Sequence, residues 1–257
     1  MYCHIIGYPL NNPRSVKIWK NFFKKKKIKC KMTAKEVYPK NLKLTLEQFK
    51  LDNRFIASAV TMPFKRKAVK YINFADKITK FSNSINLIVK DKRNKLLGYN
   101  TDVAGAIETI KQFKKENIMI FGLGGTGKAI LKVFLKIYKS SKFIVISSKK
   151  HKEFYSNKKI LQKKKIFNKD IKNIDLFINC SPLGSDLKKS YVQNSPLSAE
   201  QVSLMQKKAV IFDLVYKPLK TKLFKISKLY KKKYINGLKM NTVQANKALK
   251  IVSKNMY

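Results

Sequence analysis

Residues 117–147 read "NIMIFGLGGTGKAILKVFLKIYKSSKFIVIS", and this stretch predicts a strand, a loop, a helix and a second strand. The apolar runs at 117–121 and 142–147 are typical of short buried strands. Apolar side chains recur between them at helical spacing, at Ile130, Leu131, Phe134, Leu135 and Tyr138. The whole stretch has the length of a β-α-β unit, about 30 residues. It therefore predicts an α/β fold with parallel strands and right-handed crossovers.

The loop "GLGGTGKA" after the first of these strands satisfies one nucleotide-binding pattern and misses another by one residue. Gly122, Gly124 and Gly127 spell the G-x-G-x-x-G of dinucleotide-binding proteins. Gly122, Gly127 and Lys128 also have the spacing of the phosphate loop of ATPases and GTPases. That loop needs a Ser or Thr hydroxyl to bind Mg²⁺, and Ala129 stands in its place.

The residues that end the second strand favour the dinucleotide interpretation. An acidic side chain there would hydrogen bond to the ribose 2′-hydroxyl of NAD. This chain instead has Ser148 and Lys149, a hydroxyl and a cation that suit the 2′-phosphate of NADP. Two alternatives stay open: Lys149 and the following Lys150 are two lysines among many, and the strand at 209–213 ends in Asp213 like the acidic strand of a nucleotide hydrolase.

The chain is strongly basic. Its 257 residues include 58 Lys and Arg against 14 Asp and Glu, a formal net charge of +44. A nucleic-acid partner is one explanation, because Lys and Arg neutralise phosphates. The lysines are spread along the whole chain without an Arg/aromatic RNA-binding signature, which favours a compositional bias that enriches Lys everywhere. With 44% hydrophobic and 11% aromatic residues, the chain is predicted to be globular.

The cysteines and histidines argue against a metal site. Cys3, Cys30 and Cys180 are odd in number and widely spaced, so they predict neither a disulfide framework nor a zinc site. His4 lies in an apolar run and is expected to pack in a strand, and His151 is expected in a solvated loop. Without an apolar run of membrane length or a signal-peptide core, we expect a cytoplasmic protein.

Further elements are expected on both sides of the glycine loop. Before it, strands are expected at 5–7, 29–37, 55–60 and 84–89, and helices at 15–24, 45–51 and 64–72. Residues 85–89 and 95–97, separated by "KDKRN", predict an antiparallel pair. After it, strands are expected at 175–179, 209–213 and 234–235, and a last helix at 241–254.

Two polar motifs stand at predicted helix starts. "VTMPFK" (60–65) carries Lys65 after a proline that begins a helix at the end of a strand. "GYNTD" (98–102) carries Asp102 at the start of another helix, with Thr101 as its candidate cap. A Lys and an Asp brought together make a proton-transfer pair. Periodicity does not join them, and Asp102 alone is a first-turn acid favoured by the helix dipole.

Eight motifs, taken together, resemble the shikimate dehydrogenase family in order and spacing, over nearly the whole chain. They are "GYP" (7–9), "VTMPFK", "SIN" (84–86), "GYNTD", "GLGGTGKA", "INCSPLG" (178–184), "FDLVYKPLKT" (212–221) and "NGLKMNTVQA" (236–245). The resemblance implies NADPH-dependent reduction of 3-dehydroshikimate to shikimate, a step of aromatic amino-acid and chorismate biosynthesis. It implies a small-molecule substrate. From the composition we expect no membrane and no specific nucleic acid as partners, and we expect a monomer or homodimer.

The resemblance also implies the domain organisation. An N-terminal α/β substrate-binding and catalytic domain, 1–101, would be completed by the C-terminal segment 240–257. Residues 102–239 would form a Rossmann-type NADP-binding domain, with the active site in the cleft between the two.

Site residues follow from the same resemblance. Lys65 and Asp102 would be the catalytic pair that protonates the developing alkoxide. The residues that would bind substrate are Ser15, Thr61, Asn86, Tyr216 and Gln244. The residues that would bind the cofactor are Gly122, Gly124, Gly125 and Gly127 at the pyrophosphate, Ser148 and Lys149 at the 2′-phosphate, and Ser181, Leu214 and Gly237 at the nicotinamide. No metal ligand is implied.

Three departures from the family pattern affect the substrate side. Pro13 replaces the first Ser of the usual S-x-S-P, Ala59 replaces the Asn before the "VT" motif, and Trp19 with Lys20 replaces a helical His-Asn. We hypothesise that Arg14 compensates in part by offering charge to the substrate carboxylate.

Other functions remain as alternatives. One is a quinate-accepting relative, which is disfavoured because a preference for NAD would call for an acid near Ser148. Another is a catalytically degenerate protein that binds nucleic acid or nucleotides. Retention of both Lys65 and Asp102 in their motifs argues against loss of catalysis.

Overall fold

The computed structural model describes residues 1–10 and 13–256, which divide into two compact units. The first unit is Met1–Ala106 with Thr242–Tyr257, and the second unit is Ile107–Asn241. The chain passes from one unit to the other within helix α5 (Thr101–Ile110) and again within helix α11 (Gly237–Lys254). Across the part of the chain described, every helix is too short or too polar to cross a membrane.

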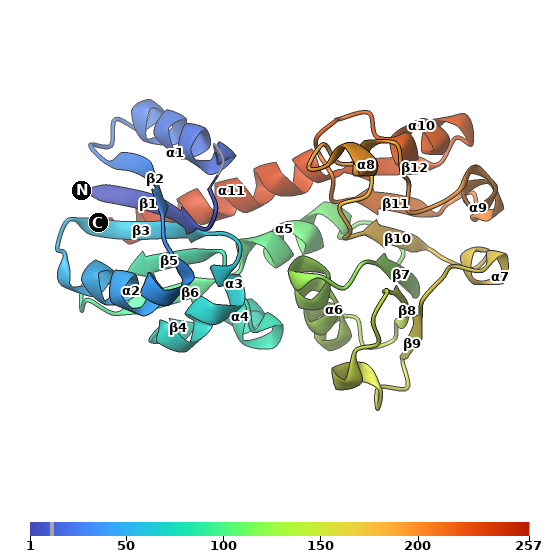
Figure 1. Cartoon of the computed structure of the whole chain (residues 1–257), viewed down its shortest axis with the longest axis horizontal. Helices are drawn as coiled ribbons and strands as arrows, with labels where there is room; N and C mark the ends of the chain where they lie inside the picture. Colours follow the sequence, from blue (N-terminus) through green and yellow to red (C-terminus); the bar gives the residue numbers. More distant parts are fainter. Residues whose placement is uncertain (11–12, 257) are drawn as a thin grey trace. The chain divides into compact units, whose positions relative to one another are not determined.

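One six-stranded mixed sheet forms the centre of the first unit (Figure 1). Its strands are β1 (Tyr2–Gly7), β2 (Lys31–Glu36), β3 (Phe55–Val60), β4 (Phe74–Ala75), β5 (Leu87–Lys90) and β6 (Leu96–Tyr99), in the order β2-β1-β3-β5-β6-β4. β1 is parallel to β2 and β3, whereas β5 is antiparallel to β3 and β6, which confirms the predicted antiparallel pair. The beginning of β5 therefore lies beside the carboxyl ends of β3 and β6.

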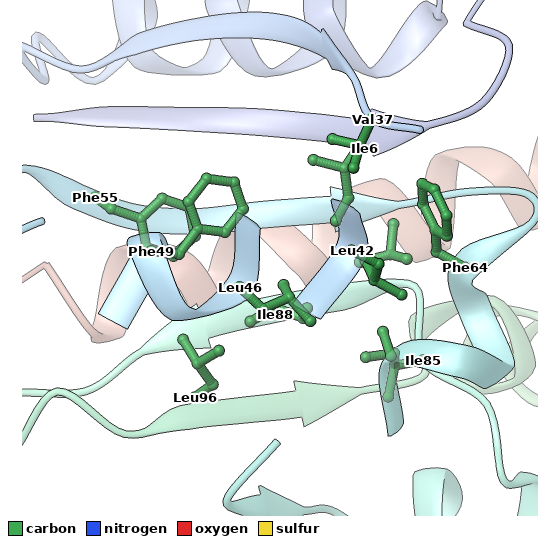
Figure 2. Packing of buried hydrophobic residues seen from close by; sticks show 12 residues of the cluster. Ile6, Val37, Leu42, Leu46, Phe49, Phe55, Phe64, Ile85, Ile88 and Leu96 are labelled. Carbon is green, nitrogen blue, oxygen red and sulfur yellow. The ribbon is translucent and has the colours of Figure 1, made fainter. Parts of the chain in front are cut away.

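Helices cover both faces of this sheet. On one face, α1 (Arg14–Lys25) and α11 bury Trp19 and Phe23 together with Ala248 and Leu249. On the other face, α2 (Leu42–Leu51) and α3 (Phe64–Lys67) pack on one cluster of buried residues, with Phe49 and Phe55 near one end and Phe64 near the other (Figure 2). The rings of Phe49 and Phe55 are stacked, with centroids 4.0 Å apart. Each fully buried Phe contributes about 1.5–3 kcal/mol relative to an exposed one.

Short elements of the first unit differ from the sequence prediction. The helix expected at 64–72 is divided into α3 and a 3₁₀ turn, Ala68–Tyr71, and a further 3₁₀ turn covers Pro39–Asn41. Helix α4 (Lys77–Ser82) was missed, although both of its ends carry recognisable signals. The Asp76 carboxylate accepts from the Thr79 backbone N–H at its start, and Asn83 ends it in the left-handed conformation.

The second unit contains a six-stranded sheet in which all strands are parallel (Figure 1). Its strands are β7 (Asn117–Phe121), β8 (Lys142–Ile146), β9 (Ile160–Lys163), β10 (Leu176–Asn179), β11 (Val210–Asp213) and β12 (Lys233–Asn236). Their order, β9-β8-β7-β10-β11-β12, is that of a dinucleotide-binding Rossmann fold, in which ligands collect where the order reverses, between β7 and β10.

The helices of the second unit are α6 (Gly125–Ile137), α7 (Asn168–Ile171), α8 (Lys189–Val192), α9 (Ala199–Leu204) and α10 (Lys222–Leu229), with a 3₁₀ turn at Lys152–Phe154. The predicted β-α-β unit is confirmed as β7, α6 and β8, and the fully buried Ile130, Leu131 and Phe134 form the predicted apolar stripe of α6. Helices α7, α9 and α10 pack on a second cluster of buried residues centred on Phe177 and Ile211.

Candidate active site

The structure joins the two polar motifs through an ion pair. Lys65 Nζ in α3 donates a hydrogen bond to Asp102 Oδ2 in α5 over 2.6 Å, although the two residues are 37 positions apart. Their side chains are 29% and 20% exposed, so the pair is accessible and partly shielded from water. The structure thus shows that Lys65 and Asp102 are in contact, which helical periodicity could not predict.

Backbone hydrogen bonds between neighbouring strand ends hold this pair in place. The Ile85 N–H, just before β5, donates to the Lys65 carbonyl over 2.8 Å and fixes α3 beside the sheet. The Val60 N–H, at the end of β3, donates to the Asn86 carbonyl over 2.8 Å. Because β5 runs antiparallel to its neighbours, Asn86 lies at the same sheet edge as the residues that follow β3 and β6.

Asn86, Thr101 and Gln244 form one hydrogen-bonded group. Asn86 Oδ1 accepts from the Thr101 backbone N–H over 2.7 Å, and Asn86 Nδ2 donates to Thr101 Oγ1 over 2.9 Å. Gln244 Oε1, from α11, lies 3.4 Å from Asn86 Nδ2 and 3.2 Å from Thr101 Oγ1. Since Thr101 directly precedes Asp102, this group adjoins the ion pair in the chain.

The prediction that Thr101 caps α5 is wrong. Asn100 provides the cap: its Oδ1 accepts from the Val103 backbone N–H over 3.0 Å, while its Nδ2 donates to the Ser84 carbonyl over 2.9 Å. The helix begins at Thr101, one residue earlier than a Thr101 cap requires, and this frees the Thr101 hydroxyl for the group around Asn86. The sequence signal for this role was the Asn directly before the helix.

In the second unit, the glycine loop brings the ends of β7 and β10 close together. Gly122 has φ +94°, and a Cβ there would lie 2.9 Å from the Ser181 backbone nitrogen. A Cβ on Gly127 would lie 2.1 Å from the Gly122 carbonyl oxygen. Around the exposed Gly124 and Gly125, by contrast, a Cβ would meet no atom within 4 Å. Open space at the N-terminus of a 13-residue helix fits a pyrophosphate, which backbone N–H groups and the helix dipole attract.

The remaining candidate cofactor residues lie at strand ends of the same sheet. Ser181 donates through its hydroxyl to Asn179 Oδ1 over 2.7 Å, just after β10. Leu214 follows β11 and Gly237 follows β12, and they are so close that a Cβ on Gly237 would lie 2.0 Å from the Leu214 carbonyl oxygen. Tyr216 lies two residues after Leu214 and also belongs to the second unit.

Ser148 and Lys149 follow β8 and are exposed. Beside them, His151 is partly buried. Its Nε2 lies within hydrogen-bond distance of Ser147 Oγ, at 3.1 Å. Its loop position was predicted correctly and its solvated state was not. Burial lowers the pKa of His151, with nearby Lys128 lowering it further.

Comparison with known proteins identifies the family. Residues 5–88 match the model of the shikimate dehydrogenase substrate binding domain. The NADP(+) shikimate dehydrogenase of Methanocaldococcus jannaschii is 30% identical, over 96% of this chain and 89% of its own length. That of Clostridium botulinum strain Loch Maree is also 30% identical, over 95% and 93%. This chain belongs to the shikimate dehydrogenase family.

A solved structure agrees. A crystal structure of a shikimate dehydrogenase in complex with NADP⁺ aligns with a TM-score of 0.83 at 28% identity, covering 98% of this chain and 90% of that one. The mixed first sheet and the parallel second sheet are therefore the architecture of this family, as the sequence motifs predicted.

Two of the departures from the family pattern have a packing role. Trp19, in place of the usual His, is 2% exposed and packs edge-on against Phe23, with ring centroids 6.1 Å apart. Ala59 packs against the same cluster of buried residues. Ser15 lies in the first turn of α1 and Thr61 directly after β3; within residues 1–10 and 13–256, neither hydrogen bonds to the group around Asn86.

The phosphate-loop alternative is wrong for this family member. Lys128 lies in the first turn of α6, and its ammonium pairs with Glu153 over 3.0 Å. Asp213, which resembled the acidic residue of a nucleotide hydrolase, is fully buried and accepts hydrogen bonds from Asn179 and Tyr234. Its oxygens also accept from the Val215 N–H and the Thr221 hydroxyl, so hydrogen bonds within the protein occupy the lone pairs that a metal ion would need.

Proposed function

We propose that this shikimate dehydrogenase family member reduces 3-dehydroshikimate to shikimate with NADPH. The observation that carries the proposal is the 2.6 Å ion pair between Lys65 and Asp102, adjoining the polar group of Asn86, Thr101 and Gln244. A chain released from catalysis would have no need to keep both charges at one sheet edge. The family membership of the chain supports the same activity.

We propose that residues 1–101 with 240–257 bind the substrate and that residues 102–239 bind NADP(H). The division into Met1–Ala106 with Thr242–Tyr257 and Ile107–Asn241 supports this assignment. The match of residues 5–88 to a substrate binding domain, and the Rossmann strand order of the second unit, support it independently.

In the proposed reaction, Lys65 is the proton donor. NADPH, when bound, supplies the hydride that reaches the ketone carbon. The Lys65 ammonium donates a proton from Nζ to the ketone oxygen as negative charge develops there, and the product is an alcohol. Asp102 holds the ammonium in position and stabilises its charge. Water replaces the lost proton, because the Lys65 side chain is 29% exposed.

Asn86, Gln244 and Thr61 would position the ring hydroxyls. The Gln244 side-chain oxygen is directed at Asn86 and Thr101, which leaves its amide N–H groups to donate to a substrate hydroxyl. Ser15 and Tyr216 would bind the substrate carboxylate. On the cofactor side, Gly122, Gly124, Gly125 and Gly127 would bind the pyrophosphate, Ser148 and Lys149 the 2′-phosphate, and Ser181, Leu214 and Gly237 would border the nicotinamide.

Arg14 is our candidate for a second carboxylate-binding group. It is the first residue of α1, next to Ser15, and is exposed. Its charge would offset the hydroxyl lost at Pro13. We expect Arg14→Ala to raise the KM for 3-dehydroshikimate several-fold with little change in kcat. An unchanged KM in steady-state assays would show that this idea is wrong.

The test of the proposed function follows nicotinamide absorbance with purified full-length protein. Shikimate and quinate are each offered with NADP⁺ and with NAD⁺. We expect turnover with shikimate and NADP⁺ and much weaker turnover in the other three combinations. Absence of turnover in all four from folded protein that binds polynucleotide would overturn the proposal. Turnover of quinate with NAD⁺ as the best pair would replace it by the quinate alternative.

We propose that small molecules are the partners of this chain and that no specific nucleic acid is. A monomer or a homodimer is expected, and light scattering of the purified protein distinguishes them.

A further inference from the structure

Two cysteines far apart in the sequence meet in the first unit. Cys3 lies in β1, and Cys30 immediately precedes β2. The 3.6 Å between their Sγ atoms is a side-chain contact across 27 positions of chain, and both are free thiols. Because Cys3 pairs with Met32 in the parallel ladder and Cys30 is two residues before Met32, all three side chains belong to the α1 side of the sheet.

The two thiols differ in accessibility. Cys3 is fully buried, whereas Cys30 is partly exposed and flanked by the exposed Lys29 and Lys31. Burial raises the pKa of the Cys3 thiol. The hydrogen bond from Cys3 lowers the pKa of Cys30, because it stabilises the Cys30 thiolate. Cys30 is thus the nucleophile that a reagent can reach, and Cys3 is a second thiol held against it.

We propose that Cys3 and Cys30 form a thiol–disulfide exchange site, which an external disulfide of the glutathione type oxidises to an intramolecular disulfide. The Cys30 thiolate attacks one sulfur of the external disulfide, forms a mixed disulfide and releases one external thiol. Cys3 then loses its proton and attacks the Cys30 sulfur, which releases the second external thiol. The protein loses two hydrogen atoms and two electrons, and the external disulfide gains them.

The geometry favours the second step. The sulfur atoms must approach from 3.6 Å to the bonded distance of about 2.05 Å. Cys30 lies in the loop between α1 and β2, outside the strand ladder, so its backbone can move without breaking β2. The buried Cys3 side chain, in contrast, is held by strands on both sides.

Trp19 can report on formation of the disulfide, and Cys180 is a control cysteine outside the pair. Trp19, the only tryptophan, lies in the same cluster of buried residues as Cys3, and the new bond would close the segment that contains α1. Cys180 lies in the second unit, where burial raises the pKa of its thiol. It has no cysteine partner among the residues described, so it cannot form an intramolecular disulfide, and its raised pKa leaves little thiolate to exchange with glutathione.

The experiment incubates the full chain with oxidised and reduced glutathione in defined ratios, quenches with acid, alkylates and maps peptides by mass spectrometry. We expect a peptide linked through Cys3 and Cys30, a molecular mass lower by two hydrogen atoms, alkylated Cys180, and a shift in Trp19 fluorescence that a reductant reverses. Dependence on the glutathione ratio gives the redox potential of the pair.

Variants separate the two steps. Cys30→Ser should neither exchange nor link, whereas Cys3→Ser should retain glutathione on Cys30 as a stable adduct. Cys180→Ser should behave like the wild-type chain. Recovery of Cys3 and Cys30 as free thiols under oxidising glutathione, or accumulation of glutathione on Cys30 in the wild-type chain, would overturn the proposal. The wild-type measurements decide this even where a variant folds poorly, and they do not depend on catalytic activity.

Discussion

Asn179 Nδ2, at the end of β10, donates a hydrogen bond of 2.9 Å to Asp213 Oδ1, at the end of β11, and both side chains are completely buried. Asp213 Oδ2 also accepts from the Tyr234 hydroxyl over 2.8 Å, while Asn179 Oδ1 accepts from Ser181. This buried pair thus fixes the start of two loops at once. Those loops carry Ser181 and Leu214, the proposed neighbours of the nicotinamide.

Replacing Asp213 by Ala should destabilise the second unit by about 3–5 kcal/mol, because it leaves several buried donors without an acceptor. Tyr234→Phe removes one of these donors and should cost about 1–2 kcal/mol. Hydrogen exchange of the β10 and β11 amides measures both losses within the second unit. Equal losses in the two variants would contradict a role for Asp213 as the common acceptor.

Lys65 and Lys67 offer a matched pair of lysines in α3. If Lys65 transfers a proton in the transition state, Lys65→Met should lower kcat by about 10²–10⁴ while KM changes little. Lys67 is exposed, and Lys67→Met should leave both constants near the wild-type values. Steady-state kinetics with NADPH and 3-dehydroshikimate give the comparison. A similar loss of kcat in both variants would indicate that the substitutions disturb α3, and would contradict a specific role of the Lys65 ammonium.

Lys149 should determine the choice of cofactor. A charge-assisted hydrogen bond to the 2′-phosphate is worth about 1.5–3 kcal/mol, so Lys149→Ala should raise the KM for NADPH about tenfold or more. The KM for NADH should stay unchanged, because NADH lacks this phosphate. The control is Lys136→Ala, at an exposed position near the end of α6. Equal effects on NADPH and NADH would place Lys149 elsewhere than at the 2′-phosphate.

Local sequence signals predicted the β7-α6-β8 part of the second unit closely, but they did not predict its short helices α7, α8 and α9 or its helix α10. The strand pattern and glycine loop of residues 117–147 specify a β-α-β unit by themselves, and the structure follows them closely. α11 begins at Gly237, four residues before the expected start at Asn241, because the apolar periodicity of this helix is weak at its beginning. β9 was missed because it has only four residues, Ile160–Lys163, of which two are polar, and lies at the sheet edge.

The candidate active site could be predicted only in part, because its contacts are long-range. The Lys65 and Asp102 motifs were recognisable in the sequence. The ends of β3 and β6, which precede them, are brought together because β5 pairs with both strands, and this pairing depends on the whole sheet. The bond from Asn86 to Gln244 spans 158 positions of sequence and depends on where α11 packs. Neither the contact between Cys3 and Cys30 nor the buried pair of Asn179 and Asp213 has a local signal.

His4 confirms the prediction of a histidine packed in a strand. Its Nδ1 lies 2.8 Å from Thr33 Oγ1, and its ring stacks on Phe49 with centroids 5.6 Å apart. Burial lowers the pKa of His4 below 6.5, and Lys35 lowers it further. His4 therefore binds a proton more readily in the unfolded chain than in the folded one.

The contribution of His4 to the free energy of unfolding of the first unit should consequently be complete above about pH 6.5 and be lost as the pH drops from there through the lowered pKa of His4. His4→Gln should flatten this dependence, because Gln does not titrate. His151→Gln, which alters a less buried histidine of the second unit, should leave it intact. Urea unfolding followed by Trp19 fluorescence reports on the first unit. A steep slope that survives in His4→Gln would assign the pH dependence to carboxylates instead.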